Sequence, residues 1–173
     1  MIKVEIGPGI NRLGNDWIGV GPYAQSTVDH ICMWGKDNLP FKDGSVDIIY
    51  ASHVIEHIWW YKVNLALADV YRCLKQDGVV EIWTVNFSAV VQGYLNESCG
   101  DAYRAYNSEN DFMRWVNGKI FSHGNPPTWA HHSCFDTISL KKELMKVGFE
   151  PFPLTIPRGI NHDSNLGIGG IKR

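Results

Sequence analysis

The sequence has few of the features that mark specialised classes of protein. Its four cysteines are far apart and form no Cys-x-x-Cys pair, and the run His131-His132-x-Cys134 matches no standard zinc spacing. No apolar run approaches the roughly 20 residues that a membrane-spanning helix needs. The 16 lysines and arginines are balanced by 18 aspartates and glutamates, so no basic excess points to nucleic acid. We therefore expect no metal, no membrane and no nucleic-acid partner.

What remains is the composition of an ordinary globular protein. The chain has 173 residues, of which 45% are hydrophobic and 20% charged, and this suits one domain over residues 1–173. Its first five residues, MIKVE, lead directly into a strand pattern and do not resemble a signal peptide. Scattered cysteines in a chain of this size are typical of reduced thiols. We expect a cytoplasmic protein.

Apolar periodicity predicts strands that alternate with helices. Strands are predicted over residues 2–6, 17–20, 27–32, 46–51, 79–85, 149–156 and 166–171, and helices over 56–75, 137–147 and near 111–116. The stretch from Gly9 to Trp17 is too short for a crossover helix, because such connections usually need about a dozen residues. We therefore predict an α/β fold with a mostly parallel sheet, a C-terminal antiparallel hairpin and a first crossover helix that is shortened or missing.

The stretch from Val46 to Ile58 indicates where a site lies. An apolar strand runs into a polar turn at Ser52, and open α/β sheets bind ligands at the carboxyl ends of their strands. His53, Glu56 and His57 are spaced to share one face of a helix. Because histidine titrates near neutral pH, we predict a catalytic group in which Glu56 orients His53 as the base, with His57 beside them. The alternative is that Glu56 and His57 only cap and pack the helix start.

Further motifs accompany this block along the chain. They are Glu5-x-Gly7-x-Gly9, Leu39-Pro40-Phe41, Ser45-Val46-Asp47, the stretch from Tyr71 to Gly78, and His132 to Asp136 followed by Leu140, Leu144 and Gly148-Phe149. Together they resemble the class I S-adenosylmethionine-dependent methyltransferases, in particular a compact bacterial subgroup of the type 11 kind. The resemblance covers nearly the whole chain except about residues 86–110.

The resemblance implies a Rossmann-like methyltransferase fold and S-adenosylmethionine as cofactor. The residues that it assigns to cofactor binding are Glu5, Gly7, Gly9, Gly21, Met33, Trp34, Gly35 and Ser52. Gly7 and Gly9 would face the methionyl part of the cofactor, and Met33 to Gly35 would contact its adenine. His132 would help to bind the acceptor. The expected acceptor is an oxygen or nitrogen of a small molecule or saccharide, and the expected protein partner is a second copy of the chain.

Two departures from the family pattern leave alternatives open. Gly21 stands where the family has a carboxylate for the ribose, and a lost charge-assisted hydrogen bond costs about 1.5–3 kcal/mol. The short first crossover also removes a helix N-terminus from the cofactor site. Asp16 and Asp29 are candidate substitutes for the carboxylate. One alternative is a non-catalytic binding or scaffold protein of the same fold. Another is a different nucleotide-binding enzyme, which is disfavoured because Gly7-Pro8-Gly9 lacks the third glycine of the dinucleotide-binding fingerprint.

Overall fold

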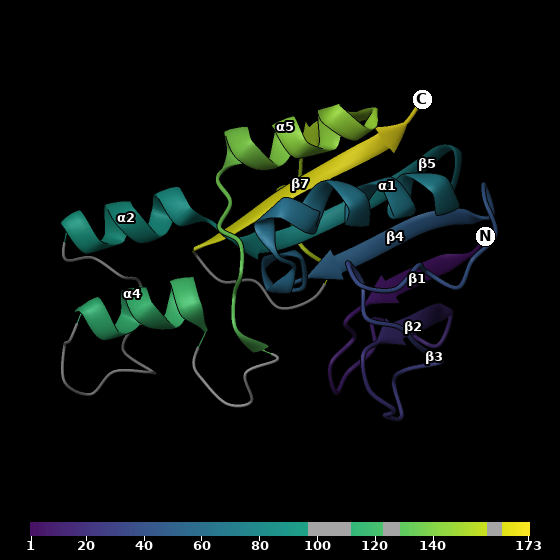
Figure 1. Cartoon of the computed structure of the whole chain (residues 1–173), viewed down its shortest axis with the longest axis horizontal. Helices are drawn as coiled ribbons and strands as arrows, with labels where there is room; N and C mark the ends of the chain where they lie inside the picture. The colour runs from purple at the N-terminus through teal and green to yellow at the C-terminus, as the bar shows by residue number, and fades with distance from the viewer. Residues whose placement is uncertain (97–111, 123–128, 159–163) are drawn as a thin grey trace.

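A seven-stranded sheet forms the centre of the computed structural model, which describes residues 1–96, 112–122, 129–158 and 164–173 (Figure 1). The strand order is β3-β2-β1-β4-β5-β7-β6. The strands are β1 (Lys3–Ile6), β2 (Trp17–Gly21), β3 (His30–Ile31), β4 (Val46–Ser52), β5 (Leu74–Val85), β6 (Phe149–Pro153) and β7 (Asn165–Lys172). Strands β1 to β5 pair in parallel, whereas β7 is antiparallel to both β5 and β6. The predicted fold class is confirmed.

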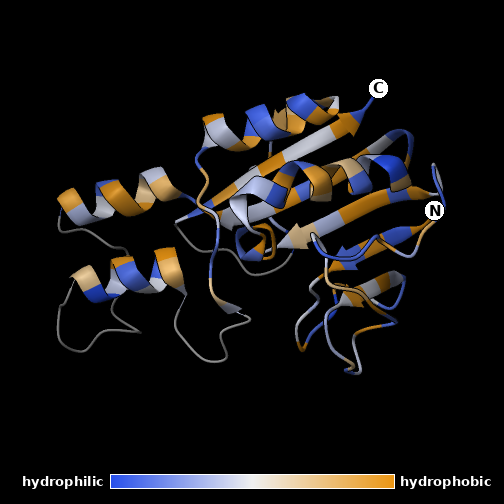
Figure 2. Ribbon diagram, viewed as in Figure 1, coloured by the Kyte–Doolittle hydropathy of each residue, from blue (hydrophilic) through white to orange (hydrophobic). Residues whose placement is uncertain are grey.

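Two helices cover one face of this sheet. The helical segments are η1 (Ile55–His57), η2 (Trp60–Lys62), α1 (Val63–Cys73), α2 (Phe87–Leu95), α4 (Phe112–Phe121) and α5 (Thr137–Val147). Helices α1 and α5 lie side by side over the sheet, and α2 and α4 pair with each other beyond its end (Figure 1). Both α1 and α5 mix hydrophobic and hydrophilic residues (Figure 2), as expected of helices with one buried and one exposed face.

The sequence explains where α5 begins and ends. Asp136 accepts a hydrogen bond from the Ser139 backbone N–H, and the Ser139 hydroxyl is bonded in return to the Asp136 backbone N–H, which forms a capping box. Gly148 closes the helix at a φ of 110°, a conformation that glycine adopts without strain. Between these caps, Leu140 and Leu144 are fully buried against the sheet.

The opposite face of the sheet is covered differently. Within the described ranges its buried cluster consists of strand residues Trp17, Tyr50 and Trp83, and no helix contributes to it. The guanidinium of Arg158 lies 5.6 Å from the centre of the Trp17 ring and makes two hydrogen bonds to Glu81. Cations with long apolar stems thus cover surface that a crossover helix would otherwise bury.

The connections from β1 to β2 and from β2 to β3 are loops, held together by Arg12. Its guanidinium donates hydrogen bonds to the backbone carbonyls of Trp17 (3.0 Å) and Thr27 (2.7 Å) and forms an ion pair with Asp29 (3.0 Å). We call this set of contacts the Arg12 clamp. The Thr27 hydroxyl also donates to the Gly9 carbonyl (2.5 Å), so both loops behave as one packed unit.

Three predicted elements are shorter than expected; the strand predicted over residues 149–156 ends at Pro153, and hydrogen bonds explain the other two. The strand predicted over residues 27–32 reduces to β3, because Asp29 bonds to the Gly19 backbone N–H (2.8 Å) and to Arg12. The helix predicted from Glu56 begins as an α-helix only at Val63, and two short 3₁₀ turns, η1 and η2, precede it. The backbone carbonyl of Glu56 instead accepts the N–H of His132 (2.7 Å), and that of Ile58 accepts the Ser133 hydroxyl. These carbonyls are therefore bonded to a distant segment, which the local sequence does not reveal.

The Arg12 clamp makes a testable contribution to stability. We expect Arg12→Met to lower the free energy of unfolding by about 3 kcal/mol, because it leaves part-buried carbonyls without their charged donor. The matched control is Arg173→Met, since Arg173 pairs with Glu150 and Asp77 on the exposed surface and should cost less than about 1 kcal/mol. Urea unfolding measures both variants, and equal losses would show that the clamp has no special role.

Candidate functional site

A cavity of about 620 Å³ opens where β1, β2 and β4 end. This volume lies within the range of small-molecule sites. The residues that line it are Ile6, Gly7, Gly9, Ile10, Gly21, Pro22, Tyr23, Ala24, Gln25, Cys32, Met33, Trp34, His53, Val54, His57, Ile58, Ser122, Trp129 and His131. They come from three sources: the loops after β1 to β3, the turn after β4, and the segment after α4. The cavity therefore lies at the edge of the sheet where the sequence predicts a site.

Two glycines shape the cavity wall after β1. Gly7 and Gly9 have φ values of 71° and 59°, and the Gly7 N–H is bonded to the carbonyl of Val20 (2.8 Å). A Cβ atom on Gly7 would lie only 2.5 Å from the Val54 side chain. A Cβ on Gly9 would meet nothing within 4 Å. The backbone at Gly9 thus borders open space, which suits close approach by a ligand.

The wall after β2 holds no carboxylate. A Cβ on Gly21 would lie 2.9 Å from Cγ2 of Val28, so an acidic side chain there would displace Val28. The two candidate substitutes are engaged elsewhere, since Asp16 pairs with Lys3 and Asp29 belongs to the Arg12 clamp. The polar side chains that this loop does bring to the cavity are those of Tyr23 and Gln25.

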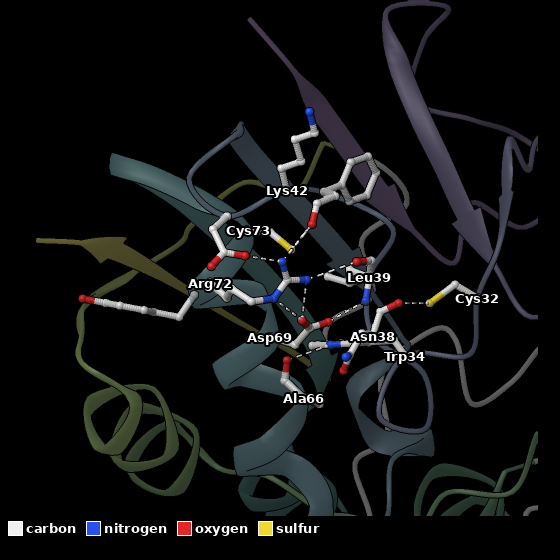
Figure 3. Close-up of polar contacts among 12 residues, drawn as sticks. Cys32, Trp34, Asn38, Leu39, Lys42, Ala66, Asp69, Arg72 and Cys73 are labelled. Carbon is white, nitrogen blue, oxygen red and sulfur yellow. Dashed lines mark hydrogen bonds and ion pairs between the residues drawn. The ribbon is translucent and has the colours of Figure 1, made fainter.

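The wall after β3 is fixed to helix α1. Trp34 is only 6% exposed and donates from its indole nitrogen to a backbone carbonyl of α1 (2.9 Å). Asp69 accepts the Leu39 N–H (2.6 Å), and Arg72 donates to the Leu39 carbonyl (3.1 Å), as Figure 3 shows. Leu39 and the residues after it therefore form a packed loop outside the cavity, whereas Met33 and Trp34 line it.

His53 and Glu56 form a buried pair at the turn after β4. Nδ1 of His53 lies 2.9 Å from Oε1 of Glu56, which is 2% exposed. Burial raises the pKa of Glu56, but the hydrogen bond and charge of His53 outweigh it, so the pKa lies below its ordinary value. His53 has a φ of 54°, which is strained for a residue with a side chain. The side chain is 34% exposed, but its Nε2 is buried.

His57 and His131 together form a further wall of the cavity. Their rings are 4.9 Å apart in an edge-to-face arrangement. Nδ1 of His57 is bonded to the carbonyl of Ala130 (3.2 Å), and Nδ1 of His131 to that of Lys119 (3.0 Å). Burial lowers the pKa of His131. This wall unites two distant parts of the chain, the turn after β4 and the segment after α4.

A second, small cavity of about 10 Å³ lies behind this wall. Oε2 of Glu56 and the hydroxyl of Thr84 are buried there without a hydrogen-bond partner among the described residues. Lys119 also borders it, and burial lowers the pKa of that lysine. The far side of Glu56 therefore faces a confined polar space.

The structure brings part of the predicted site together. The predicted residues that line the large cavity are Gly7, Gly9, Gly21, Met33, Trp34, His53 and His57. Those that do not are Glu5, Gly35, Ser52, Glu56 and His132. Glu5 accepts the Leu13 N–H (2.8 Å) and so fixes the loop that carries the glycines, while His132 stacks on Trp59 with ring centres 4.0 Å apart.

Sequence reasoning missed other lining residues, namely Tyr23, Gln25, Ser122, Trp129 and His131. For His131 a signal existed: successive side chains of an extended segment point to opposite sides, so one of two adjacent histidines had to face away from the cavity. Across the described part of the chain, no three His, Cys, Asp or Glu side chains are grouped to hold a metal ion. Nor is any helix there long and apolar enough to cross a membrane.

Comparison with known proteins agrees with this geometry. A family model described as a methyltransferase domain matches residues 20–82, a little over a third of the chain. No curated protein matches. A methyltransferase from Thermotoga maritima, described as a possible histamine N-methyltransferase, is 22% identical with a TM-score of 0.59, over 99% of this chain and 82% of that one.

Two further solved structures are similar over 99% of this chain. A methyltransferase from Archaeoglobus fulgidus is 14% identical over 86% of its length, with a TM-score of 0.59. The 1,6-didemethyltoxoflavin-N1-methyltransferase of Burkholderia thailandensis, solved with its substrate and S-adenosylhomocysteine, is 12% identical over 70% of its length, also with a TM-score of 0.59. The resemblance predicted from the motifs is thus confirmed: the chain has the fold of these methyltransferases, and its residues 20–82 match the model of a methyltransferase domain.

Proposed function

We propose that this protein transfers a methyl group from S-adenosylmethionine to an oxygen or nitrogen atom of a small molecule or saccharide. The observation that carries the proposal is the open cavity, which has a glycine wall on one side and a histidine wall on the other. A scaffold protein that had lost the cofactor would be expected to fill this space with its own side chains. Trp17 instead packs on the other face of the sheet, and Trp34 forms a wall.

The residues present fit the cofactor. The backbone at Gly7 and Gly9 would hold its methionyl part, and Met33 and Trp34 would flank its adenine. With Gly21 unable to supply a carboxylate, the side chains of Tyr23 and Gln25 would bond the ribose hydroxyls. Glu5, Gly35 and Ser52 do not line the cavity and would instead hold the backbone of the loops that do. The bound cofactor would supply an electrophilic methyl group.

The acceptor side supports a small-molecule substrate. Ser122, Trp129 and His131 line the cavity beside His57, and a space of about 620 Å³ suits a cofactor with a compact acceptor. His53 and Ser122 both have positive φ values, and such strain in residues that line a cavity is common at functional sites. His53 remains the predicted base and Glu56 its orienting partner, while His57 lies beside them.

The cofactor assignment is tested by adding one methyl group. Gly9 and Gly44 share a φ of 59° and have no atom within 4 Å of an added Cβ, but only Gly9 lines the cavity. We expect each alanine variant to lose about 1 kcal/mol of stability from its backbone conformation. Only Gly9→Ala should weaken S-adenosylhomocysteine binding, by roughly tenfold or more, because its methyl group enters the cavity.

Isothermal titration calorimetry measures both affinities. If wild-type protein gives no heat with millimolar S-adenosylhomocysteine, the proposed enzyme function is refuted. If Gly9→Ala and Gly44→Ala bind equally well, the cofactor lies elsewhere.

The buried pair predicts how stability depends on pH. Because the pKa of Glu56 is lower in the folded protein than the ordinary value of 4.5, its ionised form stabilises the fold above that value. This contribution is lost as the pH falls through the lower, folded pKa. We therefore expect wild type to be more stable than Glu56→Gln near pH 7 and the difference to shrink between about pH 5 and pH 3. Urea unfolding at each pH measures it, and a constant difference would contradict the assigned charge.

A further inference from the structure

The hydrogen bonds of His57 and His131 define which ring nitrogen carries hydrogen. Each Nδ1 is bonded to a backbone carbonyl oxygen, that of Ala130 or of Lys119. A carbonyl oxygen can only accept, so Nδ1 must be the donor in both rings. In the neutral ring, Nε2 then carries a lone pair and acts as a hydrogen-bond acceptor. The Nε2 atoms of His57 and His131 are therefore both hydrogen-bond acceptors.

Both of these nitrogens are unpaired within the described part of the chain. No described residue makes a hydrogen bond to either Nε2, and both rings are only partly buried. Both rings line the large cavity, with centres 4.9 Å apart. His53 differs from them, because its Nδ1 is bonded to Glu56 and its Nε2 is buried.

The surroundings favour the neutral form of His131. Burial lowers its pKa, and Glu56 and the hydrogen bond to the Lys119 carbonyl oppose this only in part. A neutral imidazole can accept a hydrogen bond and then a proton, which a protonated ring cannot.

We propose that His57 and His131 form the acceptor subsite, which binds a hydroxyl or amine group through its hydrogens and takes up the proton that methylation releases. This inference rests on the proposed function and deepens it. As the acceptor oxygen or nitrogen forms its bond to the methyl carbon, the carbon–sulfur bond breaks with its electron pair going to sulfur. The acceptor's proton passes to Nε2 of one histidine and from there to water. In this scheme one of these two histidines replaces His53 as the base, because Nε2 of His53 is buried; His53 instead positions Glu56 and the turn.

The same geometry disfavours other occupants of this subsite. A carboxylate group has no hydrogen to donate to two lone pairs, so it would bind only if both rings moved their hydrogens to Nε2 or became protonated. A metal ion would need further ligands, and the described residues offer no third His, Cys, Asp or Glu in a suitable place. A substrate with O–H or N–H groups satisfies both nitrogens without any rearrangement.

Nitrogen-15 NMR of the histidine rings tests the proposal on the full chain. The probes are ethane-1,2-diol and ethanolamine, which present hydrogen-bond donors, and acetate, which at neutral pH only accepts. We expect both neutral rings to carry hydrogen on Nδ1, and the two donor probes to shift both Nε2 resonances while acetate does not. Hydrogen on Nε2 in either ring, a stronger response to acetate, or no response to any probe would overturn the proposal.

Matched variants separate this subsite from the cofactor site. His131→Asn keeps an N–H donor for the Lys119 carbonyl but removes Nε2, and His30→Asn is the control because His30 is an exposed residue outside the cavity. We expect His131→Asn to weaken ethanolamine binding roughly tenfold while S-adenosylhomocysteine affinity stays within about twofold, because only one hydrogen-bond acceptor is lost. Unchanged ethanolamine binding refutes the subsite. Failure of wild type to bind S-adenosylhomocysteine refutes the proposed function alone, because the NMR experiment needs no cofactor.

Discussion

The contacts of the Arg12 guanidinium are those on which the loops after β1 and β2 depend. Parallel strands need long connections, which usually carry helices, but the connections after β1 and β2 are loops. Arg12 joins these loops through the carbonyls of Trp17 and Thr27, and the Thr27 hydroxyl continues the link to Gly9. The glycine wall and the Tyr23–Gln25 wall thus keep their shape without a helix behind them.

Because the connections after β1 and β2 carry no helices, the two faces of the sheet are covered differently. Helices α1 and α5 lie over one face of the sheet (Figure 1) and give it an apolar core. The other face relies on aromatic residues covered by cations, such as Arg158 over Trp17. The chain after β5 also contributes residues to the cavity. Ser122, Trp129 and His131, which follow α4 in the chain, line the cavity together with Gly7, Gly9 and His57 from the first half of the chain.

Much of this architecture could be predicted from the sequence, because apolar periodicity and glycine turns act locally. The mostly parallel sheet, its C-terminal antiparallel pair, the missing first crossover helix and the caps of α5 are of this kind. The site was harder to predict. Asp29 was a candidate for the ribose, but Arg12 and Gly19 engage it, and His131 reaches His57 only because the Glu56 carbonyl pairs with His132. Contacts between segments about 75 residues apart leave no periodic pattern in a single sequence.

The central claim is that the cavity beside Gly9 holds a sulfonium nucleoside without a carboxylate for its ribose. A crystal structure with S-adenosylhomocysteine tests it most directly. The account predicts the ligand between the Gly7–Gly9 turn and the side chains of Tyr23 and Gln25, with its sulfur facing His57 and His131. A ligand bound elsewhere on the protein, or a cavity that stays empty at millimolar ligand, would contradict it.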